Sequence, residues 1–451
     1  MSQQDQPPLR FGFAGHPVKC GHDLVIGAGE VFPELNFTLP PMALEPETWQ
    51  DALAEYRAIS EMIPGACRRL QLSGLVVEIE LLPPMTEVPE WGAEVTALMA
   101  RALDQAHQES GLRSALRVTP VDLRDAIRPP VLRSGEKLAS MRRSFELCAE
   151  AGADILSIES VGGKEVHDEA LVYGHIPGII FALGVLAPRD MEFLWGEIVR
   201  ISREHGVVPG GDSACGFANT AMQLTSQRMV PEVLAAVIRA ASAVRSLVAV
   251  RCGAQGPSKD CAYEGPVLKA LTGIPISMEG KSASCAHFSP VGNIAGAMCD
   301  LWSNESVQNI KLLSGYAPEA YLELLAYDCR LFNAAIAAGK DSVLQQLMVE
   351  SDVTSSPQAL VLSPEATRRI ARAIEGETTA YRQTLAAARE AETMIREALA
   401  AKRLELPKPE RAWLDRLQRE LSSLPDEETE LFDSMRQEFG HLFRPESYGL
   451  S

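Results

Sequence analysis

The sequence has 451 residues, of which 46% are hydrophobic and 23% charged, and its formal net charge is −18. These proportions are those of an ordinary globular protein, and the length allows one α/β domain of about 250 residues or more with an appendage. The acidic balance excludes the basic footprint that non-specific nucleic-acid binding needs.

The chain shows no run of about 18 consecutive apolar residues, so no membrane span is expected. Its first residues, Met1-Ser-Gln-Gln-Asp-Gln-Pro-Pro, carry no basic stretch followed by an apolar one, which predicts a cytoplasmic protein without a secretory signal. The nine cysteines are an odd number, and we expect free thiols and metal ligands rather than a disulfide framework.

Residues 1–45 are rich in Gly and Pro and predict an irregular or hairpin-like N-terminal segment. Strand and helix patterns then alternate. The predicted helices are 46–62, 91–110, 134–151, 188–205 and 230–244, and the predicted strands are 74–82, 115–120, 153–159, 206–212, 246–252 and 274–278. Apolar strands separated by helices are typical of a buried parallel sheet, and the length favours a closed TIM-type (β/α)8 barrel over a doubly wound sheet. We predict that this α/β barrel is the catalytic domain and spans residues 46–345.

Beyond about residue 303 the strand signal fades, and residues 304–340 and 364–440 are predicted to be helical. An apolar stripe follows one face of a charged helix at 381–399. Its members are Tyr381, Leu385, Ala388, Ile395 and Leu399. We expect a helical C-terminal extension over residues 346–451, which forms an additional layer on the barrel or serves in assembly.

Three residues stand at or just beyond the ends of strand-like runs: Glu159, Cys215 and Cys261. Barrel enzymes carry their chemistry on the loops that follow the strands, so these side chains are expected to meet. If they do, one carboxylate and two thiolates can form a zinc site with an open fourth position, which distinguishes a catalytic zinc from a structural one. The alternative is that the cysteines only pack in the core.

Other residues are weaker candidates. Cys252, Cys285 and Cys299 are rival ligands. Lys164, Asp212 and Asp260 are polar neighbours that could support the ligands. His287 follows a late strand and ranks first among the histidines for the cavity.

Two further histidine groups are predicted to be structural. His16, Cys20 and His22 lack a second ligand pair at finger-like spacing and predict loop structure. His167 and His175 flank an acid/base patch with Asp168 and Glu169, in which one histidine could be catalytic, but we expect a surface turn. The glycine runs match neither nucleotide-binding fingerprint, and no serine-hydrolase elbow is present.

Several long stretches around these residues resemble one family. They are Ser157-Ile-Glu-Ser-Val-Gly-Gly-Lys-Glu-Val-His-Asp-Glu-Ala170, Gly210-Gly-Asp-Ser-Ala-Cys-Gly-Phe-Ala-Asn-Thr-Ala-Met222, Lys259-Asp-Cys-Ala-Tyr-Glu-Gly265, Pro275-Ile-Ser-Met-Glu-Gly-Lys-Ser-Ala283 and Leu301-Trp-Ser-Asn-Glu-Ser-Val307. The chain is similar, over about residues 10–340, to the zinc-containing, methanol-activating subunit of methanol:corrinoid methyltransferase.

The resemblance implies an α/β barrel with added helices and zinc held by Glu159, Cys215 and Cys261. It implies a cytoplasmic methyltransferase of one-carbon metabolism, such as methanogenesis, that passes the methyl group of methanol to the reduced cobalt of a corrinoid (cobalamin). A small corrinoid-binding protein would carry that cofactor, and the pair would assemble as a dimer of heterodimers or around a homodimer. Water, Asp212 or His287 are candidates to protonate the leaving oxygen.

Two other interpretations stay open. The protein could be a zinc methyltransferase that uses another small methyl donor or a thiol acceptor. It could also be a non-catalytic subunit that binds a corrinoid protein through its acidic surface.

Overall fold

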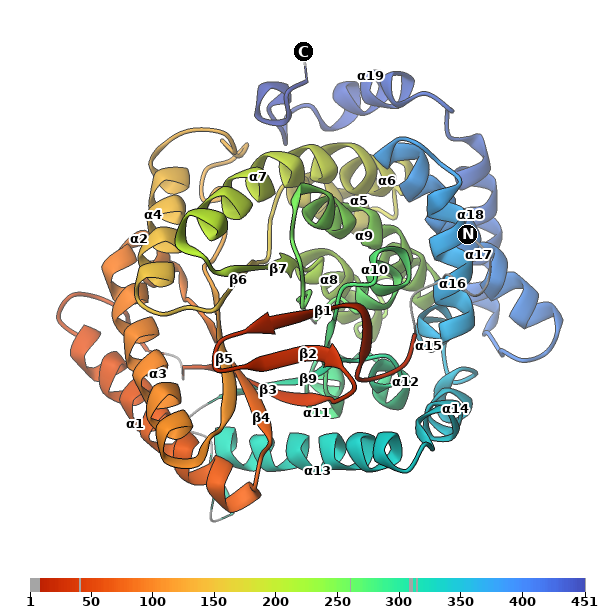
Figure 1. Cartoon of the computed structure of the whole chain (residues 1–451). Coiled ribbons are helices and arrows are strands. Elements are labelled where there is room, and N and C mark those ends of the chain that lie inside the picture. The colour runs from red at the N-terminus through yellow and green to blue at the C-terminus, as the bar shows by residue number, and fades with distance from the viewer. Residues whose placement is uncertain (1–8, 40–41, 260, 308–310, 314, 451) are drawn as a thin grey trace.

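A computed structural model of the chain describes residues 9–39, 42–259, 261–307, 311–313 and 315–450. Strands gather at the centre of the molecule and helices surround them (Figure 1). Seven parallel strands form the main sheet, in the order β7-β6-β5-β4-β3-β9-β8. Their bounds are β3 Phe32–Thr38, β4 Gly74–Glu80, β5 Arg113–Thr119, β6 Ile155–Ile158, β7 Val208–Asp212, β8 Ser277–Glu279 and β9 Leu301–Val307.

A short extended stretch, residues 255–258, closes this sheet into a barrel. On one side, two of its backbone N–H groups donate to carbonyls of β7, both at 2.8 Å. On the other side, Ser258 forms a parallel bridge with Ile276, directly before β8. With this stretch in the eighth position, the predicted TIM-type (β/α)8 barrel is confirmed.

The predicted strand at 246–252 is wrong, because these residues are the last turns of helix α9 (Glu232–Cys252). Most side chains of α9 are buried, so its sequence is apolar all round, and periodicity cannot distinguish such a helix from a buried strand. The helix is long and apolar enough to cross a membrane, but 94% of that stretch is buried inside the protein. Cys261 therefore follows the closing stretch, not a strand at 246–252.

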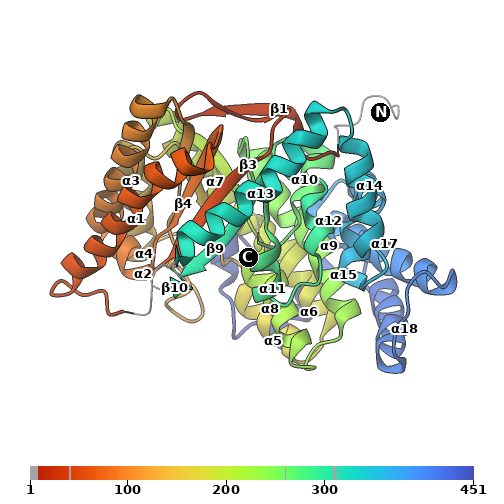
Figure 2. The same ribbon diagram turned by 90° about the horizontal axis from the view of Figure 1, so that it is seen from below.

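A hairpin of β1 (Phe13–Cys20) and β2 (Leu24–Ala28) covers the amino-terminal end of the barrel, opposite α5, α8 and α11 (Figure 2). Cys20, Leu24 and Ile26 pack there against Val76 and other side chains of the barrel strands. The next strand, β3, pairs with both β4 and β9. The barrel therefore begins before residue 46, which corrects the predicted start of the catalytic domain.

The prediction for the region after residue 300 was also wrong. β9 extends through residue 307, although helix was predicted from residue 304, and it pairs in parallel with β3 and β8. A small hairpin of β10 (Lys311–Leu312) and β11 (Gly315–Tyr316) precedes helix α13 (Ala317–Ala337).

The remaining helices of the barrel region lie outside the sheet or on the loops at its carboxyl end. They are α1 Trp49–Leu70, α2 Pro83–Glu87, α3 Pro89–Ser110, α4 Glu136–Glu150, α5 Lys164–Val172, α6 Ile176–Phe181, the π-helix η1 Ala182–Leu186, α7 Ala187–His205, α8 Cys215–Ser226, α10 Gly265–Thr272, α11 Lys281–Ala286 and α12 Gly292–Gly296.

The C-terminal region is a helical layer on one side of the barrel (Figure 1). Its elements are α14 Asp341–Asp352, α15 Pro357–Leu362, α16 Pro364–Glu375, α17 Ala380–Ala400, α18 Lys408–Ser423, α19 Glu428–Phe439 and the 3-10 turn η2 Pro445–Tyr448. The predicted stripe of α17 is buried in one core with α9, so it docks on its own chain. The chain then returns to the barrel, where the Tyr448 hydroxyl accepts a hydrogen bond from Gly163 N at 2.9 Å.

Charged side chains occupy the interior of the barrel. Arg117 of β5 donates to Glu34 of β3 at 2.7 Å, and neither side chain is exposed to solvent. Lys259 lies nearby, in contact with Glu78 and 2.6 Å from Glu80, both on β4. Arg117 and Lys259 therefore each have a carboxylate partner, which offsets the cost of burying their charges.

Candidate metal site

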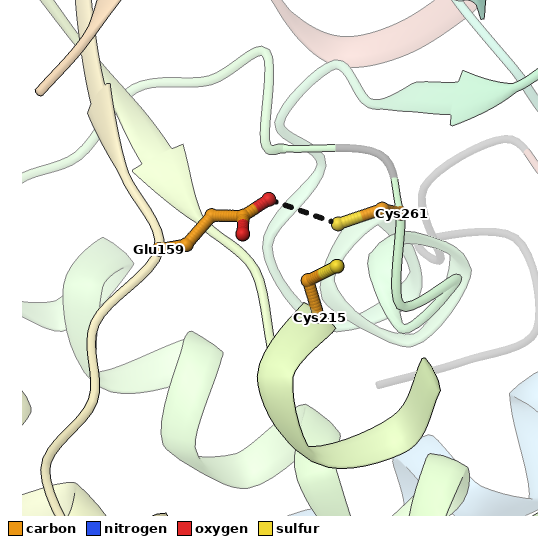
Figure 3. Close-up of side chains that lie close together, drawn as sticks. All are labelled: Glu159, Cys215 and Cys261. Carbon is orange, nitrogen blue, oxygen red and sulfur yellow. Dashed lines mark hydrogen bonds between the residues drawn. The ribbon is translucent and has the colours of Figure 1, made fainter. Parts of the chain in front are cut away.

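Glu159, Cys215 and Cys261 come together at the carboxyl end of the barrel. One possible ligand atom from each lies within 4.8 Å of the other two, and the three side chains point toward a common centre (Figure 3). The Cys261 Sγ donates to Glu159 Oε1 at 3.1 Å. Among the described residues, this is the group of His, Cys, Asp and Glu side chains with spacing suited to a metal ion.

Each side chain reaches the site from a different barrel element. Glu159 follows the last residue of β6, and Cys215 opens α8 after β7. Cys261 lies three residues beyond the closing stretch and before α10. Gly256 makes that closing stretch possible: its φ is +85°, and a Cβ there would lie 2.7 Å from Pro275 O.

The site carries more acidic groups than it can ionise without a cation. Burial raises the pKa of Cys261 well above its ordinary value, and neighbouring Cys215 and Glu159 raise it further. A hydrogen bond with Cys261 lowers the pKa of Cys215, but burial and the charge of Glu159 outweigh it and bring the pKa to about 12. A bound divalent cation would favour the deprotonated ligands, so this donor set fits zinc.

A cavity of about 270 Å³ opens beside Glu159. Its walls include Glu80, Thr119, Lys164 and Gly216, from the ends of β4 and β5 and the starts of α5 and α8. The Glu159 side chain is 35% exposed. The site is therefore open to a small reactant on this side.

The predicted supporting residues have different surroundings. Lys164 lies in this cavity wall and forms an ion pair with Asp168. Asp260 lies outside the described residues. Asp212 is buried, and its oxygens accept hydrogen bonds from Trp195 at 2.8 Å and Arg245 at 3.1 Å. It is therefore held as a structural carboxylate that braces the end of β7.

His287 lies at the end of α11, and its Nδ1 is 2.9 Å from Glu279 Oε2. The charge of Glu279 raises the pKa of both cysteine ligands, which indicates that this histidine–carboxylate pair lies near the metal site. The Tyr263 hydroxyl also donates to Glu279, at 3.3 Å.

The rival cysteines lie apart from the cluster. The Cys252 thiol faces the backbone oxygen of Glu192 at 3.8 Å, and Cys285 is exposed on α11. Cys299 is buried in a separate hydrophobic core with Phe332.

The histidine group near the N-terminus was predicted to lie in a loop, but His16 and Cys20 belong to strand β1. His22 stacks on His107 near the amino-terminal end of the barrel, while Cys20 packs in the hydrophobic cluster there. The predicted surface turn is wrong for His167, which is fully buried against Phe217. His175 caps α6 by accepting a hydrogen bond from Gly178 N.

Sequence reasoning missed four residues that surround the ligands. Ser213 and Asn219 contact the cysteine sulfurs, Lys259 lies 3.9 Å from Glu159, and Glu279 pairs with His287. Asn219 was detectable, because it stands one helical turn after Cys215. The position of Glu279 near the ligands could not be detected from the sequence, because it depends on packing between distant segments.

The fold and the site define a barrel protein with a three-ligand metal-binding geometry at the catalytic end. Residues 1–449 match the family model of the methanol-cobalamin methyltransferase B subunit. The chain is 37% identical to methanol–corrinoid protein co-methyltransferase of Methanosarcina barkeri, over 100% of this chain and 98% of that protein. It is also similar to the crystal structure of the methanol:cobalamin methyltransferase complex MtaBC from Methanosarcina barkeri, with a TM-score of 0.93, 37% identity and coverage of 98% of this chain and 97% of that one.

The chain therefore belongs to the methanol-cobalamin methyltransferase B subunit family, and it is a methyltransferase. The resemblance inferred from the sequence is confirmed.

Proposed function

We propose that this methyltransferase is zinc-dependent and transfers the methyl group of methanol to the reduced cobalt of a corrinoid carried by a partner protein. The observation that carries the proposal is the convergence of Glu159, Cys215 and Cys261 at the barrel mouth. The name of the Methanosarcina relative supports methanol as the donor and a corrinoid protein as the acceptor.

Three protein ligands leave the fourth position of a tetrahedral zinc open, as in catalytic sites. When bound, zinc would supply a Lewis acid for the methanol oxygen, and the partner's corrinoid would supply the nucleophile for the methyl carbon. Glu159, Cys215 and Cys261 would hold the metal, and Lys259 restrains the Glu159 carboxylate from 3.9 Å. The cavity beside Glu159 provides space for the donor.

Of the two side chains predicted as proton donors, His287 is the better candidate to protonate the leaving oxygen. Glu279 orients the imidazole ring through Nδ1, as a carboxylate does in many acid–base pairs. Both carboxylate oxygens of Asp212 are already engaged, one by Trp195 Nε1 and the other by Arg245, so this side chain is less available to a reactant.

The partner is proposed to dock on the barrel mouth. Large apolar side chains are exposed on segments that follow β5 to β9. They include Ile127, Tyr173, Met229, Phe288 and Leu313. Exposed apolar side chains rimmed by polar surface are typical of protein interaction sites.

The first test is the metal content of the purified protein. About one zinc per chain is expected, together with methanol-dependent methylation of reduced cobalamin. Cys215→Ala and Cys261→Ala should each lose zinc and turnover together, whereas Cys252→Ala, whose thiol lies outside the cluster, should keep both. Retained zinc and normal turnover in either ligand variant would refute the ligand assignment.

Substrate screening tests the alternatives. Turnover with a methylated amine, a methoxylated compound or homocysteine instead of methanol would establish the other zinc methyltransferase activity. Partner binding without zinc or turnover would establish a non-catalytic subunit. A cytoplasmic location and a role in methanogenesis remain predictions.

We also propose that two copies assemble, as the resemblance implies. Helix α13 bears an exposed apolar row at coiled-coil spacing, with Leu324, Tyr327 and Leu331 52%, 55% and 56% exposed. Leu324→Glu with Leu331→Glu should convert a dimer to a monomer in light scattering. An unchanged mass would exclude this helix as the contact.

A further inference from the structure

Two uncharged side chains hold the sulfur atoms of the proposed zinc site. Asn219 stands one turn after Cys215 on α8, and its Nδ2 donates to Cys215 Sγ at 3.4 Å. Ser213 lies between β7 and α8, with its Oγ 3.3 Å from Cys261 Sγ. Each cysteine therefore has its own hydrogen-bonding neighbour, and both neighbours are at most 3% exposed.

The direction of the Ser213 bond follows from its second partner. Its Oγ accepts a hydrogen bond from Ala262 N at 3.2 Å, so the hydroxyl proton remains available for sulfur. A cysteine that ligates a metal is deprotonated and can only accept. Ser213 is therefore the donor to Cys261 whenever the metal is bound.

The surrounding backbone keeps these donors in place. Ala214 N donates to Glu264 Oε1 at 2.7 Å, and Ser246 donates to the same oxygen at 2.7 Å. Arg239 of α9 also donates to the carbonyl of Ala262. The turn that carries Ser213 and the loop that carries Cys261 are thus tied to each other and to α9.

Hydrogen bonds to the two cysteine sulfurs affect the Lewis acidity of the proposed metal ion. Two thiolates and one carboxylate place three negative charges on a divalent ion, which weakens its power to polarise a bound oxygen. A hydrogen bond to a thiolate withdraws electron density from the sulfur, so the sulfur donates less to the metal. The metal then polarises a bound oxygen more strongly. The reaction proposed above depends on that polarisation, because hydroxide is a poor leaving group.

We propose that Ser213 and Asn219 are positioning residues that fix the two thiolates and moderate their donation to zinc, so that the metal remains a strong Lewis acid. This inference rests on the proposed function for its consequence in turnover. Its effect on the metal–sulfur bonds can be measured independently of turnover.

The test replaces zinc with Co(II) and records the sulfur-to-cobalt charge-transfer band. Asn219→Leu removes the donor at similar volume, and among the described residues nothing donates to its Oδ1, so no second bond is lost. Ser213→Ala removes the other donor, and Ser213→Thr restores the hydroxyl. The control is Thr220→Val on the same helix, whose hydroxyl donates to Gly216 O at 2.8 Å, away from the sulfurs.

Asn219→Leu and Ser213→Ala should shift the band to longer wavelength, while Ser213→Thr and the control keep the wild-type band. Zinc-loaded Asn219→Leu should lose about 10- to 100-fold in kcat, with one metal still bound per chain. A wild-type band in metal-loaded Asn219→Leu would overturn the inference, even if Ser213→Ala fails to fold. A shifted band in a protein that never turns over methanol would uphold the inference and overturn the proposed function.

Discussion

Replacing Lys259 with methionine should destabilise the barrel by about 3–5 kcal/mol, the cost of removing one partner of a buried ion pair. The Lys259 side chain is 1% exposed, contacts Glu78 and lies 2.6 Å from Glu80. Glu78 is fully buried, and burial already raises its pKa. Without the cation this carboxyl should take up a proton, which limits the loss to the lower part of that range.

Urea unfolding of the chelated protein, followed by circular dichroism, measures this loss without a contribution from metal binding. The control is Lys281→Met, which removes an exposed ion pair with Asp328 and should cost less than about 1 kcal/mol. Adding Glu78→Gln to Lys259→Met should recover part of the stability, because an amide needs no counter-charge. The reasoning is refuted if Lys259→Met costs no more than the control, or if the second substitution lowers stability further.

Three further predictions concern pH, the C-terminal turn and the metal. Burial and the charge of Glu410 raise the pKa of Glu232 from 4.5 to about 7, so stability should fall as pH rises through that window. Glu232→Gln should therefore be more stable than wild type at pH 8 by about 1–2 kcal/mol, after allowance for solvent screening; an equal difference at pH 4 would contradict the assignment. Tyr448→Phe removes the acceptor for Gly163 N and should cost about 1–3 kcal/mol, with faster hydrogen exchange in the loop after Glu159; unchanged exchange would show that the tail does not hold this loop. Chelation should lower the Tm of wild type but not of Cys261→Ala, because zinc stabilises the native state only where it binds; equal shifts in both would argue against the site.

Much of the fold follows from local patterns. The strands β4 to β7 were predicted to within a few residues, because each is a short apolar run bounded by helices and turn residues. The errors occur where local pattern and tertiary setting diverge. Residues 246–252 are apolar because α9 is enclosed on all sides, and β3 was hidden in a segment rich in glycine and proline.

The sequence by itself determined the alternation of strands and helices, the family resemblance and the three residues Glu159, Cys215 and Cys261 as candidates. Only the tertiary structure decided that their side chains lie within 4.8 Å of one another and that residues 255–258 complete the barrel. It also decided that Asp212 is held by buried partners and that Ser213 and Asn219 reach the sulfurs. The physical reason is that burial and periodicity are properties of each segment, whereas distances between segments depend on how the whole barrel closes.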